Sequence, residues 1–237
     1  MRHLPNLMTL ANLFCGCMAI VAIFNAKLET AGLLIVIALV LDFLDGFVAR
    51  ALHAYSELGK QLDSLADMVS FGVVPGMMLY TIFFMGSVMS EVNPTLLLAG
   101  QYSMFIVTLF SCLRLAKFNL DPRQASYFIG LPTPANTLVV MSFPFILNHD
   151  TFGFSSWIYH PVFLVIFMII SSFMLVAEIP LISLKFKSFA WQQNKGPYLL
   201  LAGSVILMLT LKYAAPPFII LFYVILSLVF PPTTTKT

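Results

Sequence analysis

Four aspartates within residues 42–67 are the side chains in this sequence most able to do chemistry. The chain of 237 residues contains six aspartates, and four of them are Asp42, Asp45, Asp63 and Asp67. Asp42 and Asp45 are three residues apart, so a helix places them on one face. Asp63 and Asp67 are four residues apart, so they share one face of a second helix in the same way. If these two faces meet, four carboxylates converge on one small volume.

A cluster of this kind favours a metal site over a chance grouping of acids. Like charges so close together cannot all stay ionised unless cations lie between them. Carboxylate oxygens are the ligands that hard ions such as Mg²⁺ or Mn²⁺ prefer. The flanking residues 31–41 and 68–86 are strongly apolar, and carboxylates beside a bilayer core are costly and usually functional. A solvated helix end with scattered acids is the alternative, but it does not explain why both pairs keep helical spacing.

The composition is that of an integral membrane protein. Hydrophobic residues make up 60% of the chain, charged residues 9%, and the mean hydropathy is +0.96. We therefore predict an all-α polytopic membrane helix bundle, a single domain over residues 1–237, with about eight transmembrane helices. The predicted spans are residues 8–26, 31–52, 68–88, 95–115, 134–148, 157–177, 197–213 and 216–231. Pro75 and Gly76 inside the third span predict a kink near the carboxylates. The net charge of +2 gives no indication of nucleic acid, and we expect none as a partner.

The basic residues predict an orientation for these spans. With a cytoplasmic N-terminus, two basic residues fall outside, Lys27 and Lys212. The other ten are then cytoplasmic: Arg2, Arg50, Lys60, Arg114, Lys117, Arg123, Lys185, Lys187, Lys195 and Lys236. This bias predicts that the aspartate cluster and both termini lie at the cytoplasmic face.

The four aspartates belong to a longer pattern, D-x2-D-G-x2-A-R-x8-G-x3-D-x3-D, which also contains Gly46, Ala49, Arg50 and Gly59. This pattern resembles the signature of the CDP-alcohol phosphotransferases, and every fixed position fits. The resemblance extends over about residues 5–136.

Two further segments narrow the resemblance within that family. Residues 62–76, LDSLADMVSFGVVPG, are similar to the phosphatidylserine synthase branch. Residues 130–136, GLPTPAN, are a second and weaker likeness to the same branch, although a plain junction between a loop and a helix also explains them.

The resemblance implies a reaction, its metal ions and an assembly. CDP-diacylglycerol would be attacked by an alcohol, with release of CMP, at a site holding Mg²⁺ or Mn²⁺, two ions in all. Asp42, Asp45, Asp63 and Asp67 would hold metal, and Asp67 would also act as general base. The fold would be a six-helix family core with two further C-terminal helices, in a homodimer, in the plasma (inner) membrane among its lipids.

The acceptor alcohol that best fits the resemblance is L-serine, which would give phosphatidylserine. Glycerol 3-phosphate or inositol would be attacked by the same chemistry and are alternatives. A membrane transporter with an acidic ion path is an alternative from another class. A transporter more commonly places its acids in paired half-repeats, whereas here they cluster in two neighbouring helices.

Residues of the N-terminal segment and of the first part of the motif, residues 42–50, are expected to bind the liponucleotide. Arg50 would bind the diphosphate, since guanidinium groups match phosphate oxygens, and Gly46 belongs to the same motif. Asn6 and Thr9 lie on one helical stripe with Asn12 and resemble the part of the family's CDP pocket contributed by its opening segment. Helix capping is the alternative for that stripe.

Three more residues complete the predicted substrate contacts. The family often has a hydroxyl near Ser56 that contacts the liponucleotide. Arg114 and Lys117 stand three residues apart at the same predicted membrane edge and resemble a segment of the phosphatidylserine synthases. They would bind an anion, either the lipid phosphate or the serine carboxylate. Ordinary positive-inside flanking is the alternative, and lysine at position 117 lacks the bidentate fork of arginine.

Overall fold

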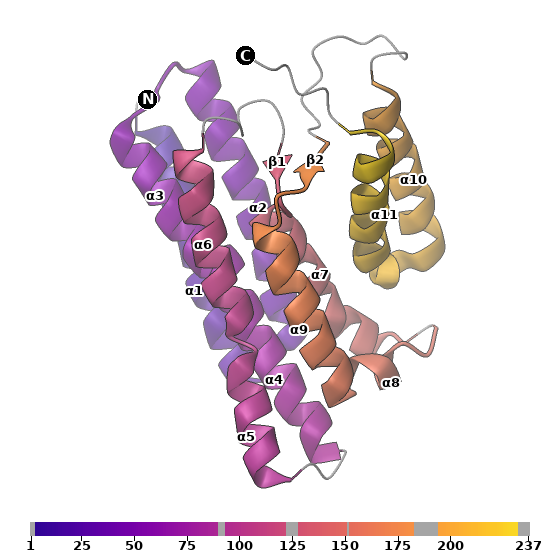
Figure 1. The fold of residues 1–237 in the computed structure, drawn as a ribbon. Coiled ribbons are helices and arrows are strands. Elements are labelled where there is room, and N and C mark those ends of the chain that lie inside the picture. The colour runs from indigo at the N-terminus through magenta and orange to yellow at the C-terminus, as the bar shows by residue number, and fades with distance from the viewer. Residues whose placement is uncertain (1–2, 90–92, 122–127, 151, 183–193, 232–237) are drawn as a thin grey trace.

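Long helices packed along a common direction make up most of the molecule (Figure 1). The computed structural model describes residues 3–89, 93–121, 128–150, 152–182 and 194–231. Its elements are α1 (Leu4–Phe24), α2 (Leu28–Ala51), α3 (Glu57–Asp67), the π-helical turn η1 (Met68–Val73), α4 (Val74–Met89), α5 (Pro94–Ser103), α6 (Ile106–Leu120), β1 (Phe128–Ile129), α7 (Thr133–Asn148), α8 (Ser155–Ile158), α9 (Pro161–Val176), β2 (Pro180–Leu181), α10 (Lys195–Leu211), the 3-10 turn η4 (Lys212–Ala214) and α11 (Ala215–Val229).

The predicted all-α polytopic membrane bundle is confirmed. By length and composition, five helical stretches are able to cross a membrane: Leu4–Phe24, Leu28–Ala51, Glu57–Met89, Pro94–Leu120 and Lys195–Val229. The last stretch contains α10 and α11, which run antiparallel as a hairpin (Figure 1). The helices α7 and α9 have 16 residues each, fewer than the roughly 20 that cross the hydrocarbon core unaided. The number of crossings therefore stays a prediction.

The third predicted span begins earlier than expected. The acidic helix α3 continues through η1 into α4, so the helical stretch runs from Glu57 to Met89 and not from residue 68. Ser56 starts it, because the Ser56 hydroxyl accepts a hydrogen bond from the Gly59 N–H across 3.0 Å, as an N-cap does. Asp63 and Asp67 therefore lie on the first turns of a membrane helix.

The predicted irregularity near Pro75 takes the form of the π-helical turn η1. In a regular helix residue 75 would donate to the Phe71 carbonyl, but proline has no N–H. The Thr137 hydroxyl lies 3.0 Å from that carbonyl oxygen. The Thr108 hydroxyl donates to the Gly72 carbonyl across 2.9 Å. Side chains of α7 and α6 thus satisfy backbone groups just beyond the acidic cluster.

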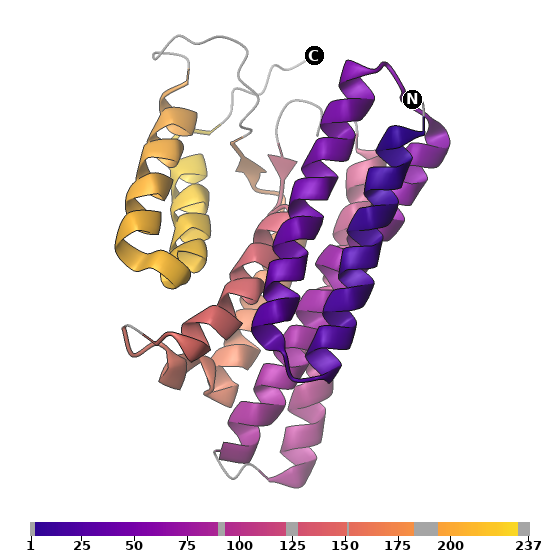
Figure 2. The same ribbon diagram turned by 180° about the vertical axis from the view of Figure 1, so that it is seen from behind.

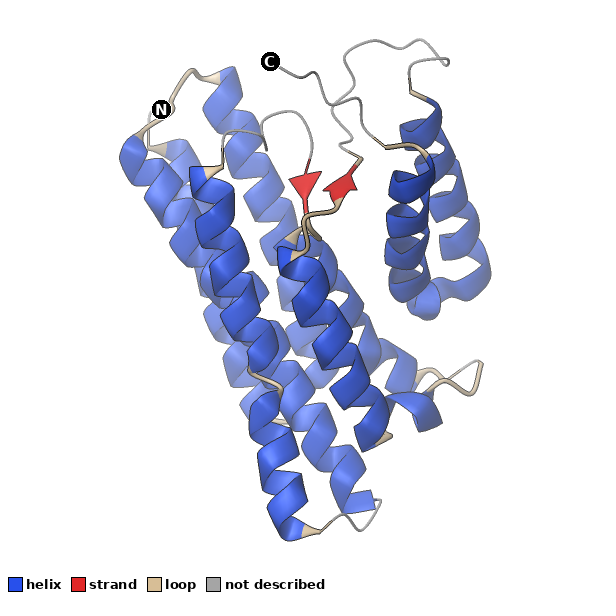
Figure 3. Ribbon diagram, viewed as in Figure 1, coloured by secondary structure: helices blue, strands red, loops and turns tan. Residues whose placement is uncertain are grey.

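Two apolar cores hold the helices together. The larger core joins α1, α2, η1, α4 and α7 with α9, and Figure 2 shows α1 and α2 side by side on one face of this bundle. The smaller core joins β2 with α10 and α11 through Leu181, Ile182, Leu200, Tyr223 and Leu226. In the described part of the chain, the antiparallel pair β1–β2 is the whole of the β structure (Figure 3).

The helix ends that carry most of the basic residues lie at one end of the bundle. The end of α2, the start of α3, the end of α6 and the start of α10 are at the same end (Figure 1). The α1–α2 turn and η4, which carry Lys27 and Lys212, are at the other. Five residues used for the predicted orientation lie outside the described residues: Arg2, Arg123, Lys185, Lys187 and Lys236.

Candidate functional site

Three aspartates from two helices meet at one end of the bundle. Asp42 lies on α2, and Asp63 and Asp67 lie on α3. One carboxylate oxygen of each residue lies within 4.8 Å of those of the other two. The two acidic helix faces expected from the sequence therefore meet through these three side chains. Three oxygen donors at this spacing fit a hard divalent cation.

The fourth aspartate, Asp45, stands beside this group of three. Asp45 is buried, and its Oδ2 accepts a hydrogen bond from the Thr9 hydroxyl across 2.5 Å. Its charge also interacts with those of Asp63 and Arg50. The expected contact of Thr9 with the nucleotide stays a prediction; in the structure Thr9 lines the cavity beside the acids and its hydroxyl donates to Asp45. Thr9 is thus a residue that orients Asp45.

Asp67 is buried where α3 meets η1. The Asn12 side-chain amide donates to Asp67 Oδ1 across 3.4 Å, and the Ser70 hydroxyl donates to the Asn12 carbonyl across 3.1 Å. Asn12 was expected only as part of a polar stripe with Asn6 and Thr9. The stripe could have indicated this contact, because α1 packs against both acidic helices and its polar face must find partners there.

A cavity of about 570 Å³ opens beside the acids. Its walls come from the start of α1, the end of α2, the α2–α3 loop and the start of α3. The predicted site residues that line it are Asn6, Thr9, Asp45, Gly46, Arg50, Ser56 and Asp63. Tyr55, Glu57 and Lys60 also line it, and no motif in the sequence singled them out.

Small and polar residues keep the walls of this cavity open. An added Cβ at Gly46 would lie 3.5 Å from Arg50 Nη1, so the exposed guanidinium extends over the glycine. An added Cβ at Gly59 would lie 3.1 Å from both Asn6 Oδ1 and Ser56 Oγ. Glycine at position 59 therefore allows α3 to approach α1 closely while those two polar atoms line the cavity.

The two basic residues at the end of α6 are in different environments. Arg114 is buried, and its Nη1 donates to the Thr133 hydroxyl across 3.4 Å. Its charge interacts with that of Asp67, and its Nε is buried without a hydrogen-bond partner among the described residues. Lys117 is exposed. Arg114 therefore lies on the packed side of α6 and Lys117 on its surface, and Thr133 was not anticipated as the partner of Arg114.

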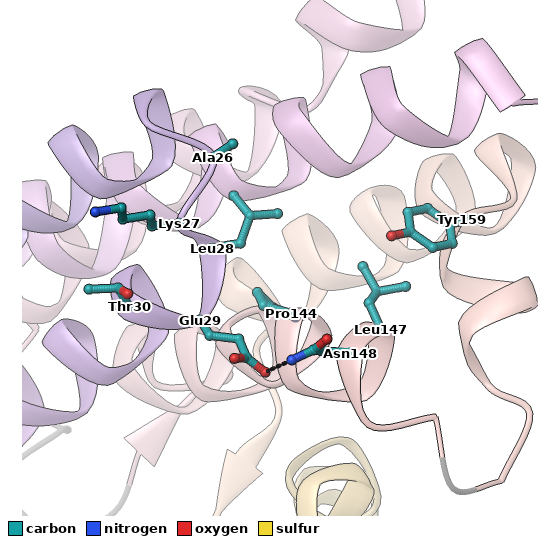
Figure 4. Close-up of a pocket in the computed structure, with 9 residues that line it drawn as sticks. All are labelled: Ala26, Lys27, Leu28, Glu29, Thr30, Pro144, Leu147, Asn148 and Tyr159. Atoms are coloured by element: carbon teal, nitrogen blue, oxygen red, sulfur yellow. Dashed lines mark hydrogen bonds between the residues drawn. The ribbon is translucent and has the colours of Figure 1, made fainter.

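A second cavity, of about 360 Å³, opens at the opposite end of the bundle. Figure 4 shows its lining, where the Asn148 amide donates to the Glu29 carboxylate across 3.0 Å. His149 Nε2 lies 3.3 Å from the same carboxylate. The residues that line this cavity include none of those predicted to bind metal or substrate. We therefore assign the candidate site to the cavity beside the aspartates.

These features define a class: a polytopic membrane protein whose helices bring a carboxylate cluster to the wall of a polar cavity. The model of the CDP-alcohol phosphatidyltransferase family matches residues 2–177. The chain therefore belongs to the CDP-alcohol phosphatidyltransferase family. The matched part includes the whole acidic cluster, Arg114 and Thr133, and it ends before α10.

Curated relatives from three organisms carry one name, CDP-diacylglycerol–serine O-phosphatidyltransferase. That of Bacillus subtilis is 38% identical over 165 residues, which are 65% of this chain and 85% of that protein. That of Helicobacter pylori is 35% identical over 139 residues, 58% of this chain and 55% of that protein. That of Methanocaldococcus jannaschii is 35% identical over 145 residues, 61% of this chain and 62% of that protein.

Proposed function

We propose that this protein transfers the phosphatidyl group of CDP-diacylglycerol to L-serine, giving phosphatidylserine and CMP. The observation that carries the proposal is the group Asp42, Asp63 and Asp67, whose oxygens lie within 4.8 Å of one another beside a polar cavity. The family membership supports the reaction class. The shared name of the three relatives supports serine as the acceptor.

The aspartates are suited to hold divalent metal ions, in a family that generally depends on them. Asp42, Asp63 and Asp67 offer three oxygens to one position, and Asp45, which accepts a hydrogen bond from Thr9 and follows Asp42 by three residues on α2, would serve a second. Mg²⁺ or Mn²⁺ bound there would neutralise charge on the diphosphate and on the departing CMP. The carboxylates also repel one another, so the protein alone holds them together at an energetic cost.

Residues around the cavity bind and orient the liponucleotide. The Arg50 guanidinium, exposed over Gly46, donates to diphosphate oxygens. Asn6 and Ser56 supply polar atoms to the cavity wall near Gly59, where they would contact the CMP moiety. The open side of the cavity admits the soluble part of the substrate while its acyl chains remain among the membrane lipids.

Asp67 acts as general base toward the acceptor. It accepts the proton of the serine hydroxyl while the serine oxygen forms a bond to the phosphorus of the phosphatidyl group. The bond between that phosphorus and the bridging oxygen of the diphosphate breaks, and the electron pair leaves with CMP. The Asn12 amide, 3.4 Å from Asp67 Oδ1, keeps the carboxylate in place during this transfer.

Arg114 binds the carboxylate of serine. It is buried, its charge reaches Asp67, and its Nε has a free donor. A buried cation beside the base favours an anionic acceptor with a hydroxyl close to the carboxylate. Lys117, exposed at the end of α6, binds anions at the membrane surface, such as the lipid phosphate.

The membrane setting of the reaction is also part of the proposal. The bias of the basic residues supports a cytoplasmic location for the acidic cluster and both termini, in the plasma (inner) membrane. The family resemblance supports a homodimer.

One assay tests the proposed function. Purified protein in detergent receives CDP-diacylglycerol, Mg²⁺ or Mn²⁺ and one of three acceptors: serine, glycerol 3-phosphate or inositol. We expect radiolabelled serine to enter lipid with an equal release of CMP, and Asp63→Asn to abolish both. Transfer to another alcohol instead of serine would contradict the acceptor, and absence of CMP release with every acceptor would contradict the reaction.

A further inference from the structure

The two short strands β1 and β2 pair antiparallel, with Phe128 opposite Leu181, and form a ribbon. This ribbon leads into the helix that carries Thr133, the partner of Arg114. The turn that follows β1 is fixed by two backbone bonds: the Gly130 N–H to the Ile179 carbonyl across 3.0 Å and the Leu131 N–H to the Met174 carbonyl across 2.8 Å. Gly130 has a φ of +72°, which favours glycine. The chain then enters α7 at Thr133, the partner of Arg114.

The ribbon is also linked to Arg114 through the Phe118 ring of α6. The Arg114 guanidinium carbon lies 4.9 Å from the centre of the Phe118 ring. The Phe118 ring in turn stacks on Phe128 of β1, with centroids 6.4 Å apart. Arg114 therefore has two supports: the Thr133 hydroxyl, just after the ribbon, and the Phe118 ring, which stacks on Phe128 of the ribbon.

Two hydrogen bonds join α11 to Ile182, the residue that directly follows strand β2 of the ribbon. The Tyr223 hydroxyl donates to the Ile182 carbonyl across 2.8 Å, and the Ile182 N–H donates to the Ser227 hydroxyl across 3.1 Å. All three residues are buried, so these bonds are shielded from competing solvent.

The hydrogen bonds that fix the ribbon come from a part of the chain outside the family model. The Tyr223 hydroxyl donates to the Ile182 carbonyl, and α11, which carries Tyr223, lies beyond residues 2–177 matched by the family model. Tyr223 is therefore linked to Arg114 through the ribbon, by way of Phe128 and Thr133.

We propose that the C-terminal hairpin α10–α11 completes the acceptor site, with Tyr223 as a positioning residue that holds Arg114 for the carboxylate of the acceptor. The proposal rests on the proposed function, because it takes the acceptor to be an amino acid with a free carboxylate. Tyr223 touches no reacting atom. It acts on Arg114 through the ribbon, whose Phe128 stacks on Phe118 and which leads into Thr133 at the start of α7.

Kinetics of single variants test this role. Tyr223→Phe keeps the ring and removes the hydroxyl. We expect the KM for serine to rise about tenfold, the size of one net hydrogen-bond contribution, while the KM for CDP-diacylglycerol stays within about twofold. Ser227→Ala, which frees the Ile182 N–H, should move the serine KM in the same direction. Tyr213→Phe is the matched control, because Tyr213 belongs to the same hairpin but stacks on His149 at the other end.

A double variant separates positioning from a general structural effect. If Tyr223 acts through Arg114, Tyr223→Phe added to Arg114→Ala should raise the serine KM by less than about twofold further. Additive effects, equal changes in both KM values, or an unchanged serine KM in Tyr223→Phe would overturn the proposal. If Tyr223→Phe does not fold, as judged by its thermal unfolding in detergent, Ser227→Ala decides by the same criteria. Wild-type protein that uses no serine would instead contradict the proposed function.

Discussion

The Thr9 hydroxyl donates to Asp45 Oδ2 across 2.5 Å, and this bond ties the first helix of the chain to the acidic arm of the second. Both residues are buried, and Thr9 also lies 3.1 Å from the Pro5 carbonyl. Carboxylate oxygens of the other three aspartates lie within 4.8 Å of one another, and Asp45 lies outside this group. Its orientation toward that group therefore depends on α1.

Loss of this bond should weaken metal binding. Thr9→Val keeps the shape of the side chain but removes the donor to Asp45. Mutation of a residue that hydrogen-bonds and orients a metal ligand typically lowers metal affinity or activity by about 10-fold to 100-fold. We expect the Mn²⁺ concentration for half-maximal CMP release to rise within that range. Thr9→Ser retains the hydroxyl and should behave like the wild type, and an unchanged Mn²⁺ dependence in Thr9→Val would show that Asp45 needs no such partner.

In the absence of metal, removal of one of the clustered aspartates should not destabilise the protein. Asp42→Asn removes one of three mutually repelling carboxylates, so the protein in a chelator should unfold at the same temperature as the wild type or higher. Addition of Mg²⁺ or Mn²⁺ should then stabilise the wild type, because a ligand of the folded state raises its stability, but not the variant. Thermal unfolding in detergent measures both. Asp121→Asn is the control, and equal stabilisation of wild type and Asp42→Asn would argue against metal at these aspartates.

The sequence predicted the acidic cluster because helical spacing directly determines which side chains share a face. Asp42, Asp63 and Asp67 meet because the two acidic helix faces pack together, and Pro75 and Gly76, which predicted a kink, lie just after the irregular turn η1. The sequence did not reveal that Thr9 and Asn12 hold carboxylates, because a polar stripe shows that partners exist without showing which they are.

The acceptor side was less predictable for a physical reason. Arg114 and Lys117 stand three residues apart, so their spacing places them on one side of α6, but Arg114 is buried and Lys117 is exposed. Helical spacing does not show where along a face the packing ends. The ribbon consists of two-residue strands, too short for any alternating pattern. The hydrogen bond from Tyr223 to Ile182, next to the ribbon, joins distant parts of the chain, which local periodicity does not report.

The π-helical turn beyond the cluster predicts a cost in stability when its side-chain donor is removed. Thr108→Val is nearly isosteric but leaves the Gly72 carbonyl without the bond that Thr108 makes across 2.9 Å. An unsatisfied buried acceptor costs about 1–3 kcal/mol. We expect the free energy of unfolding in detergent to fall by that amount in Thr108→Val and by less in Thr108→Ser. Equal stability of Thr108→Val and the wild type would mean that another group satisfies this carbonyl.

The proposed orientation is tested by cysteine labelling in a variant without the three native cysteines. Lys27 and Leu52 flank α2, whose 24 residues span about 36 Å, so cysteines at the two positions should react from opposite sides. We expect Leu52→Cys to react with a membrane-impermeant reagent only after the cytoplasmic side is opened, and Lys27→Cys to react in intact cells. The reverse pattern would place the site on the outer face and contradict the orientation.

The role of Asp67 as base gives the sharpest kinetic expectation. Asp67 is buried, receives the Asn12 amide and is the aspartate whose charge interacts with Arg114. Asp67 is therefore the member of the metal group whose charge interacts with that of the residue proposed to bind the acceptor. A general base typically contributes 10²–10⁴-fold, so Asp67→Asn should lower kcat by about that factor.

Binding should distinguish this loss from the loss of a metal ligand. Arg50, Asn6 and Ser56 remain in both variants, but Asp67 is proposed to act as base besides contacting metal, whereas Asp42 is proposed only as a metal ligand. Equilibrium binding of CDP-diacylglycerol should therefore fall less in Asp67→Asn than in Asp42→Asn. Asp42→Asn, in contrast, should weaken metal-dependent binding of the liponucleotide together with turnover. If Asp67→Asn lost binding to the same extent as Asp42→Asn, Asp67 would be a metal ligand only. If its kcat fell less than about tenfold, another group would have to take the proton of the acceptor hydroxyl, since a smaller loss than this lies below the usual contribution of a base.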